Sequence, residues 1–258
     1  MPRHHIQFPR SQKRNLEQDE VYFFLTDSDE KKKIRFHDYK EIYKIPGLYE
    51  QIFYDRLKCK SPVKVTEILQ KALLQSNDNM TELRVLDLGA GNGMMGEELK
   101  KYGVARLVGV DIIPEAYEAL ERDRPGYYDD YDVADFCNLN DNQKEKMKAW
   151  SFDCLVTVAA LGFGDIPPMA FIEAFNLLQK EAWVAFNIKE TFLDKRDTTG
   201  FSNTIRELIF SKYMDIYHLE RYRHRLSIEG EPLYYFAVAG RKTADISDDF
   251  IKSLNLEQ

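Results

Sequence analysis

The strongest constraint on the fold is an alternation, from residue 83 onward, of short apolar runs with amphipathic segments of helical period. The apolar runs are "LRVLDLG", "RLVGVD", "FDCLVTVAAL" and "AWVAFNI", and a more polar run, "YYDDYDVADF", stands after the second. The amphipathic segments between them include "MMGEELKKYG", "PEAYEALERD" and "PPMAFIEAFNLLQ". Strands that alternate with helices form a parallel sheet covered by helices on both faces. The sequence therefore predicts an α/β fold with a doubly wound, mostly parallel sheet.

The C-terminal part predicts a different strand arrangement. After a helix expected at residues 202–213, the segments "IYHLERYRHRLSIEG" and "PLYYFAVAG" alternate polar and apolar residues and are joined around Gly230. This pattern predicts an antiparallel pair of strands that ends the sheet. The same period of two places Arg221, Arg223 and Arg225 on one face, where they would bind a carboxylate or a phosphate or lie in solvent.

The first 78 residues lack the alternation and are expected to form an arm and a helical cap or lid. Residues 1–20 are polar and basic, which predicts a loose arm. A further helix is expected to begin with Ser61 as its N-cap and Pro62 at its first position. Between the arm and this helix, Pro46 and Gly47 split a segment into two short helices that carry the aromatic residues Tyr39, Tyr43, Tyr49 and Tyr54. The expected divisions are 1–78 for arm and cap, 79–242 for the main domain and 243–258 for a tail.

Composition narrows the function classes. With 258 residues, a net charge of -7 and a pI near 5.4, the chain has no global attraction to nucleic acid. Its three cysteines have no C-x-x-C spacing, which argues against a disulfide framework and a cysteine-rich metal site, so we expect no metal and a cytoplasmic location. No apolar run approaches the roughly 20 residues of a membrane span, so no membrane partner is expected. The sequence gives no indication of an oligomeric state.

The glycine-rich stretch "VLDLGAGNGMMG", residues 85–96, fits two cofactor loops. Gly91, Gly93 and Gly96 match the dinucleotide fingerprint G-x-G-x-x-G. Gly89, Gly91 and Gly93, preceded by Asp87, match the loop that many methyltransferases wrap around S-adenosylmethionine. In both cases glycine permits a tight turn and a close approach of the ligand to the backbone. The glycines alone therefore leave NAD and S-adenosylmethionine as alternatives.

Three carboxylates after consecutive strands favour S-adenosylmethionine. Asp87 would repel a pyrophosphate but suits the cationic end of a sulfonium cofactor, either directly or through water; its alternative role is to cap the amides of its own loop. Asp111 ends the second strand, where an acidic residue accepts both ribose hydroxyls. Asp135, followed by Phe136, comes after the third strand and could contact adenine. All three lie at the carboxyl edge, where open α/β sheets bind ligands.

Over roughly residues 60–190 the sequence resembles the class I S-adenosylmethionine-dependent methyltransferases of the small-molecule type. The segments "VLDLGAGNGMMGEEL", "VGVDIIPEAYEAL", "DVADF" and "FDCLVTVAAL" stand in the order expected for that family. The resemblance implies a Rossmann-like fold in which the N-terminal segment is a lid over the cofactor. It implies the following cofactor-binding residues: Tyr49, Tyr54, Asp87, Gly89, Ala90, Gly91, Asn92, Gly93, Asp111, Ile112, Asp135, Phe136 and Ala159.

The expected reaction is in-line transfer of the sulfonium methyl to a nucleophilic O, N or S of a small molecule, which depends mainly on alignment and exclusion of water. Candidate proton acceptors are Asp165, Glu190 and His224. Each has an alternative role: Asp165 could start a helix, Glu190 lies in a polar run, and His224 could face solvent. Attack on another sulfonium carbon (cyclisation or aminopropyl transfer), a non-catalytic scaffold and an NAD-dependent oxidoreductase are the competing interpretations.

Overall fold

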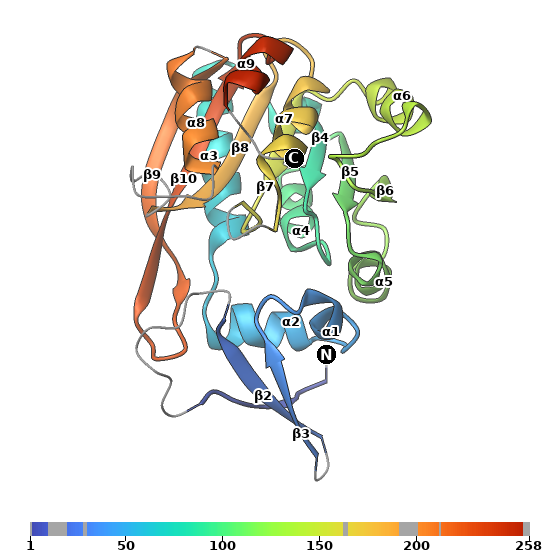
Figure 1. The fold of residues 1–258 in the computed structure, drawn as a ribbon, viewed down its shortest axis with the longest axis vertical. Helices are drawn as coiled ribbons and strands as arrows, with labels where there is room; N and C mark the ends of the chain where they lie inside the picture. The colour runs from blue at the N-terminus through green and yellow to red at the C-terminus, as the bar shows by residue number, and fades with distance from the viewer. Residues whose placement is uncertain are drawn as a thin grey trace.

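The computed structural model describes residues 2–9, 20–27, 30–161, 165–190, 201–211 and 213–254. A seven-stranded sheet with helices on its faces forms the larger part, and a smaller N-terminal part lies beyond one end of its strands (Figure 1). The strands of the large sheet are β4 (Arg84–Leu88), β5 (Arg106–Asp111), β6 (Asp130–Val133), β7 (Cys154–Thr157), β8 (Trp183–Lys189), β9 (Met214–Leu226) and β10 (Pro232–Lys242).

The order of the strands in the large sheet is β6-β5-β4-β7-β8-β10-β9. The first five are parallel, and β10 is antiparallel to both of its neighbours, β8 and β9. This confirms the predicted α/β class, a Rossmann-like, mostly parallel sheet that ends in an antiparallel pair. The strand order reverses between β4 and β7, and such a switch point opens a crevice for ligands at the carboxyl edge.

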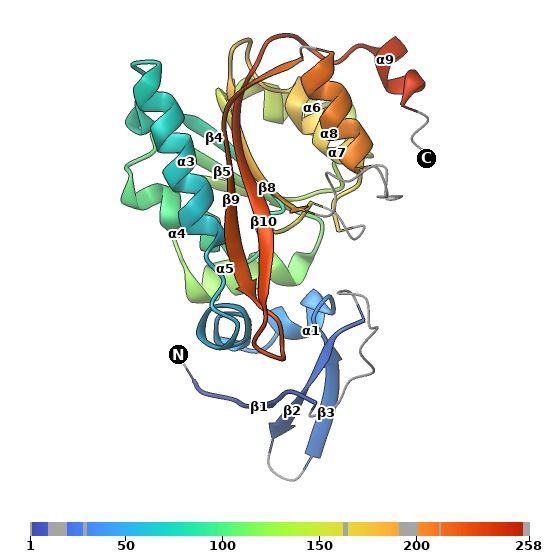
Figure 2. The same cartoon turned by 90° about the vertical axis from the view of Figure 1, so that its left-hand side faces the viewer.

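Helices cover both faces of the sheet, as Figure 2 shows with the sheet nearly edge-on. One face packs against α3 and α4, and the other against α6, α7 and α8, with a separate apolar core on each side. The helices of this part are α3 (Ser61–Gln75), α4 (Met94–Lys101), α5 (Pro114–Asp123), α6 (Asp141–Ala149), α7 (Pro168–Asn176), α8 (Phe201–Phe210) and α9 (Asp248–Ser253), with a 3₁₀ turn η2 (Met80–Glu82). The apolar stripe of α3 is buried against the sheet, so α3 belongs to this larger part and not to the N-terminal part that precedes it in the chain.

The N-terminal part, called the lid below, comprises the described residues up to Lys60 and contains a small sheet that the sequence did not predict. Its elements are β1 (His5–Gln7), β2 (Tyr22–Asp27), β3 (Glu30–Arg35), α1 (Tyr39–Tyr43), α2 (Leu48–Glu50) and a π-helix η1 (Gln51–Arg56). The three strands are antiparallel in the order β1-β2-β3. The expectation of a loose arm is therefore wrong for β1, whereas residues 10–19 lie outside the described residues. The two short helices around Gly47 are confirmed.

The small sheet escaped prediction because only one of its faces carries an apolar signal. Phe23 and Ile34 are buried in the lid core, but the other described residues of β3 are exposed, so "EKKKIR" has the composition of a charged turn. The beginning of the chain is fixed by reciprocal hydrogen bonds between the His4 backbone and the Gln51 side chain, at 2.8 and 2.7 Å. In a loose arm, the backbone N–H and C=O of His4 would instead hydrogen-bond to water.

The β9–β10 hairpin joins the lid to the sheet and extends beyond it toward the lid (Figure 2). Lys60 N donates to His224 O at 2.9 Å, and Leu226 N donates to Leu57 O at 2.7 Å. The N-cap of α3 is Lys60, so the expectation for Ser61 is wrong. The Ser61 hydroxyl is engaged instead with two side chains of β9, as described below.

Candidate functional site

A cavity of about 980 Å³, its mouth included, lies at the carboxyl edge of the sheet beneath the lid. Its floor comes from the segments that follow β4, β5, β6 and β7, and its roof from α1, α2 and η1. The predicted residues that line it are Tyr49, Tyr54, Gly89, Ala90, Gly91, Asn92, Asp111, Ile112, Asp135, Phe136, Ala159 and Asp165. Asp87, Gly93, Glu190 and His224 are not among its lining residues.

The glycine loop needs its glycines for conformation and for closeness to the lid. Gly89, Gly91 and Gly93 have φ of 73°, 54° and 86°, in the left-handed region that favours glycine. A Cβ on Gly91 would lie 2.5 Å from the hydroxyl oxygen of Tyr43 in the lid. The lid therefore rests directly on this loop, and the loop forms one wall of the cavity.

Two carboxylates at the floor are held by backbone donors. Asp111 accepts from Gly91 N through Oδ2 and from Ile113 N through Oδ1, both at 2.9 Å. Burial raises the pKa of the Asp111 carboxyl, and these backbone donors oppose the rise. Asp135 accepts from Cys137 N at 2.9 Å. Both carboxylates are thus oriented at the cavity before any ligand binds.

Asp87 is absent from the lining of the cavity, and it accepts a hydrogen bond from a tyrosine rather than from the amides of its own loop. It is 1% exposed, and its Oδ2 accepts a hydrogen bond from the Tyr128 hydroxyl at 2.5 Å. The Tyr128 oxygen in turn accepts from Gly96 N at 3.1 Å, so Asp87 supports the start of α4 through Tyr128. Burial raises the pKa of Asp87 to about 7. The carboxylate therefore supports α4 from behind the cavity wall, and its contact with the cofactor, direct or through water, stays a prediction.

Tyr128 was not among the predicted site residues, because glycines elsewhere in the chain create the space for its ring. A Cβ on Gly96 would collide with the Tyr128 ring, and one on Gly109 would lie 2.9 Å from it. Gly96 is the third glycine of the dinucleotide pattern. Here it makes room for a tyrosine, which explains that glycine without a pyrophosphate.

The roof of the cavity is made of four lid tyrosines, Tyr39, Tyr43, Tyr49 and Tyr54. Consecutive rings are in contact: Tyr39 stacks on Tyr43 with centroids 6.1 Å apart, and Tyr43 meets Tyr49 at 5.2 Å. Burial raises the pKa of all four phenols, so they are neutral at physiological pH. Tyr39 and Tyr43 were not among the predicted site residues, although their spacing of one helical turn was a readable signal.

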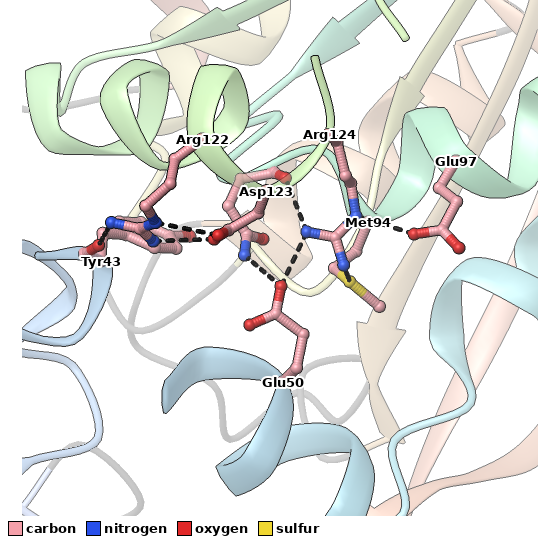
Figure 3. Close-up of polar contacts among 8 residues, drawn as sticks. Tyr43, Glu50, Met94, Glu97, Arg122, Asp123 and Arg124 are labelled. Atoms are coloured by element: carbon pink, nitrogen blue, oxygen red, sulfur yellow. Dashed lines mark hydrogen bonds and ion pairs between the residues drawn. The ribbon is translucent and has the colours of Figure 1, made fainter. Parts of the chain in front are cut away.

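A buried arginine holds the lid to the glycine loop (Figure 3). Arg124, 4% exposed, donates to Glu50 of α2 and to Glu97 of α4, each at 2.7 Å. It also donates to the backbone oxygen of Asn92 at 3.1 Å, while the Asn92 amide donates to Glu50 at 2.8 Å. These bonds connect lid, loop and α4 in one cluster. The closed lid is therefore fixed by charged hydrogen bonds as well as by aromatic contacts.

The three candidate proton acceptors lie in different environments. Asp165 lines the cavity, and its Oδ1 lies 3.2 Å from Nδ1 of His37, a lid residue that the sequence analysis did not single out. Glu190 is 36% exposed in its side chain and accepts from Arg221 Nε at 2.7 Å, so it points away from the cavity. His224 is 4% exposed, which excludes the solvent-facing alternative. Only Asp165 is placed at the cavity floor.

His224 belongs to a buried polar network that supports Ala159. The Ser61 hydroxyl lies 2.5 Å from His224 Nδ1 and 2.7 Å from the Tyr222 hydroxyl. Asn187 donates to Tyr222 at 2.9 Å, and its Oδ1 accepts from Ala159 N at 2.7 Å. Ala159 has a φ of 59°, which is unfavourable for alanine. The network therefore holds strained backbone at the cavity wall.

Replacing Asn187 by alanine should lower the free energy of unfolding by about 3 kcal/mol, because buried donors and acceptors lose their partners. Urea denaturation would measure this loss. The control is Asn142→Ala on the exposed surface of α6, which should change stability by less than about 0.5 kcal/mol. Equal stabilities for the two variants would show that the network does not support Ala159.

Within the part of the chain that the structure describes, no group of three or more His, Cys, Asp or Glu residues could hold a metal ion. Over the same residues, no helix combines the length and apolar character required to cross a membrane.

Comparisons with known proteins agree with this architecture. Residues 86–186 match the family described as "Methyltransferase domain". The N-methyltransferase NodS of Bradyrhizobium japonicum, solved with S-adenosyl-L-homocysteine, is 14% identical over 81% of this chain and 98% of its own, with a TM-score of 0.54. The magnesium protoporphyrin IX methyltransferase ChlM of Synechocystis, solved with bound S-adenosylmethionine, is 14% identical over 70% of this chain and 79% of its own, with a TM-score of 0.50.

A Pyrococcus horikoshii protein, provisionally assigned as an RNA methyltransferase, is 15% identical over 71% of this chain and 84% of its own, with a TM-score of 0.51. At these identities the likeness concerns the fold. A search of curated proteins found no match.

The strand order is that of a Rossmann-like methyltransferase fold with a cavity at its carboxyl edge, and the family match falls on the glycine loop and the strands around it. Residues 86–186 of the chain thus match a methyltransferase domain, and the glycine loop lies within the matched segment.

Proposed function

We propose that this enzyme methylates a nucleophilic O, N or S of a small molecule. The observation that carries the proposal is the roof: four lid tyrosines cover the cavity, and Arg124 holds the lid on the glycine loop. A polymer would need an open groove beside the reacting atoms, whereas a covered cavity suits a ligand that is enclosed on most sides. The net charge of -7 also disfavours a polyanionic substrate.

The floor residues fit the cofactor. Each Asp111 oxygen accepts one backbone hydrogen bond, and each retains a lone pair for a ribose hydroxyl. Asp135 with Phe136 would contact adenine, and the loop from Gly89 to Gly93 would lie along the methionine part. When bound, S-adenosylmethionine supplies a methyl group on a positively charged sulfur, which keeps the electron pair of the broken C–S bond. The neutral tyrosine faces above the loop suit a sulfonium, because aromatic faces attract cations.

The pair of His37 and Asp165 is the proposed proton acceptor. If Nδ1 of His37 donates to Oδ1 of Asp165, the carboxylate fixes the tautomer and Nε2 becomes the basic nitrogen of the ring. His37 lines a second cavity that shares a wall with the first, and Asp165 lines the first. The pair therefore spans the boundary between the proposed cofactor site and the space beside it. A proton released by an alcohol, phenol or ammonium acceptor would pass to His37.

Asp165→Asn and His37→Gln should each lower kcat by about 100-fold or more while leaving the Kd of S-adenosylhomocysteine within a factor of about 3. General-base catalysis acts on the acceptor proton and not on cofactor binding, so kcat should fall while the Kd of S-adenosylhomocysteine stays nearly constant. Single-turnover kinetics and calorimetry would measure the two quantities. Glu190→Gln is the control and should retain wild-type turnover. Unchanged kcat in both site variants would exclude this pair as the proton acceptor.

The proposed function is tested by locating the transferred methyl group. The purified enzyme is incubated with S-adenosylmethionine carrying a labelled methyl and, separately, with the metabolite, protein and RNA fractions of a cell extract. We expect label in the metabolite fraction alone, with release of S-adenosylhomocysteine. Label in protein or RNA would contradict the small-molecule acceptor. Release of methylthioadenosine would indicate attack on another sulfonium carbon, and the absence of cofactor binding would favour a scaffold.

A further inference from the structure

A second cavity, of about 540 Å³ with the open space at its mouth included, adjoins the first between the lid and the β9–β10 hairpin. Tyr39, Tyr49 and Ala159 line both cavities and form their common wall. Most of the remaining lining is aromatic or apolar, with Phe36 and Phe53 from the lid and Tyr235 from β10. This lining therefore suits a flat or apolar group beside the proposed cofactor site.

The apolar lining contains one charged side chain, that of Arg225. Arg225 is 5% exposed and lines the second cavity, with its guanidinium carbon 5.9 Å from the centre of the Phe36 ring. Its Nη1 donates to the backbone oxygen of Leu226 at 3.0 Å. Across the described ranges, no Asp or Glu forms an ion pair with it. A buried cation without a counter-charge costs free energy, and an anionic ligand would remove that cost.

A β-bulge turns Arg225 inward. Leu233 pairs with Arg225 and Tyr234 pairs with Arg223, so His224 is an extra residue in β9 without a partner of its own in the ladder. The bulge resets the alternation of side chains. The three arginines therefore do not share one face, as the period of two had predicted: Arg221 is exposed and Arg225 is buried.

His224, beside Arg225, adds a neutral donor. Burial and the charge of Arg225 lower the pKa of His224 well below its usual value, so the ring is uncharged. Asn187 donates to both Tyr222 and Ser61, and a consistent set of donors then has Ser61 donating to His224 Nδ1. In that tautomer Nε2 carries the proton. Arginine and a neutral imidazole N–H are a donor set for a carboxylate or a phosphate.

We propose that the second cavity is the methyl-acceptor site and that it binds a small organic acid, with Arg225 holding its carboxylate or phosphate. The aromatic lining would contact the body of the acid, and its nucleophile would lie at the wall shared with the first cavity. This inference rests on the proposed function, because it assigns the acceptor for the same reaction. It predicts that the enzyme selects for negative charge on its substrate, although its own net charge is negative.

The test uses simple probes on the intact enzyme saturated with S-adenosylhomocysteine. Calorimetry would measure binding of benzoate, phenyl phosphate and the neutral analogue benzamide. We expect at least one anion to bind at least about 10-fold more tightly than benzamide, as a charged hydrogen bond requires. The stronger of the two anions would identify carboxylate or phosphate. Equal or absent binding of all three, with S-adenosylhomocysteine bound, would overturn this inference alone; failure of S-adenosylhomocysteine to bind would overturn the proposed function.

Variants of two arginines on β9 provide a second test of the same inference. Arg225→Gln should lose the preference for the anion, whereas Arg223→Gln, the preceding arginine on the other side of the bulge, should keep it. Arg225→Met should also raise Tm by roughly 2–4 °C in the absence of ligand, because it removes a buried charge that no carboxylate of the described residues neutralises. Wild-type anion binding by Arg225→Gln, or a lower Tm for Arg225→Met, would show that the arginine is structural.

Discussion

Asp111→Ala should weaken binding of S-adenosylhomocysteine by about 100-fold or more. The substitution removes the acceptors proposed for both ribose hydroxyls, and it also leaves the amides of Gly91 and Ile113 without their carboxylate. Each hydrogen bond to a charged group contributes about 1.5–3 kcal/mol, so the loss of two accounts for the change. Isothermal titration calorimetry would measure it directly.

Asp132→Ala is a matched control, because Asp132 lies on the adjacent strand β6 and pairs with Lys146 away from the cavity. It should bind S-adenosylhomocysteine as tightly as the wild type. Asp111→Asn retains one acceptor for the loop and should fall between the two. If Asp111→Ala folds normally and binds the ligand within about 3-fold of the wild type, the cofactor does not use this carboxylate.

Asp87→Asn should remove a large pH dependence of stability. Burial raises the pKa of Asp87 to about 7 in the folded state, from its ordinary value of 3.8. Between these values the folded protein retains a proton that the unfolded chain releases. The associated stability is therefore fully present below about pH 4 and is lost as pH rises toward about 7, by a total on the order of 4 kcal/mol.

Urea denaturation of wild type and Asp87→Asn from pH 4 to pH 8 would measure this effect as a difference between the two proteins. The asparagine variant resembles the protonated carboxyl and should become the more stable protein above pH 7. Asp132→Asn, which alters a half-buried carboxylate of β6, should keep the wild-type pH profile. Parallel curves for wild type and Asp87→Asn would mean that Asp87 stays ionised in the fold.

Much of the fold could be predicted because the strands of the large sheet have recognisable patterns of residues in their own segments of the sequence. Buried parallel strands require continuous apolar runs, and the runs around Leu86, Val108 and Leu155 are of this kind. The position of Asp111 at the cavity follows from the same logic, since it is the last residue of its strand. Glycines with positive φ, such as Gly89, also leave a local mark, because other residues are unfavourable there.

What could not be predicted depends on contacts between distant segments. Asp87 had two plausible partners in sequence, and its actual partner, Tyr128, fits only because Gly96 and Gly109 lack side chains. His37 comes from the lid and meets Asp165 across 128 positions of the chain. Glu190 had a suitable position after a strand, but Arg221 from β9 draws it outward. Composition and periodicity carry no record of such pairs.

The bulge at His224 has a consequence for how related chains should be compared. A single residue inserted or deleted between Arg225 and the turn would move each arginine of β9 to the neighbouring ladder position, and so to the opposite face, without substituting any of them. Preference for an acidic or a neutral acceptor could thus change among relatives through one codon gained or lost rather than through substitution of a contact residue. An alignment that simply matches arginine to arginine across this strand would conceal that change, whereas one anchored on the ladder partners in β10 would reveal it.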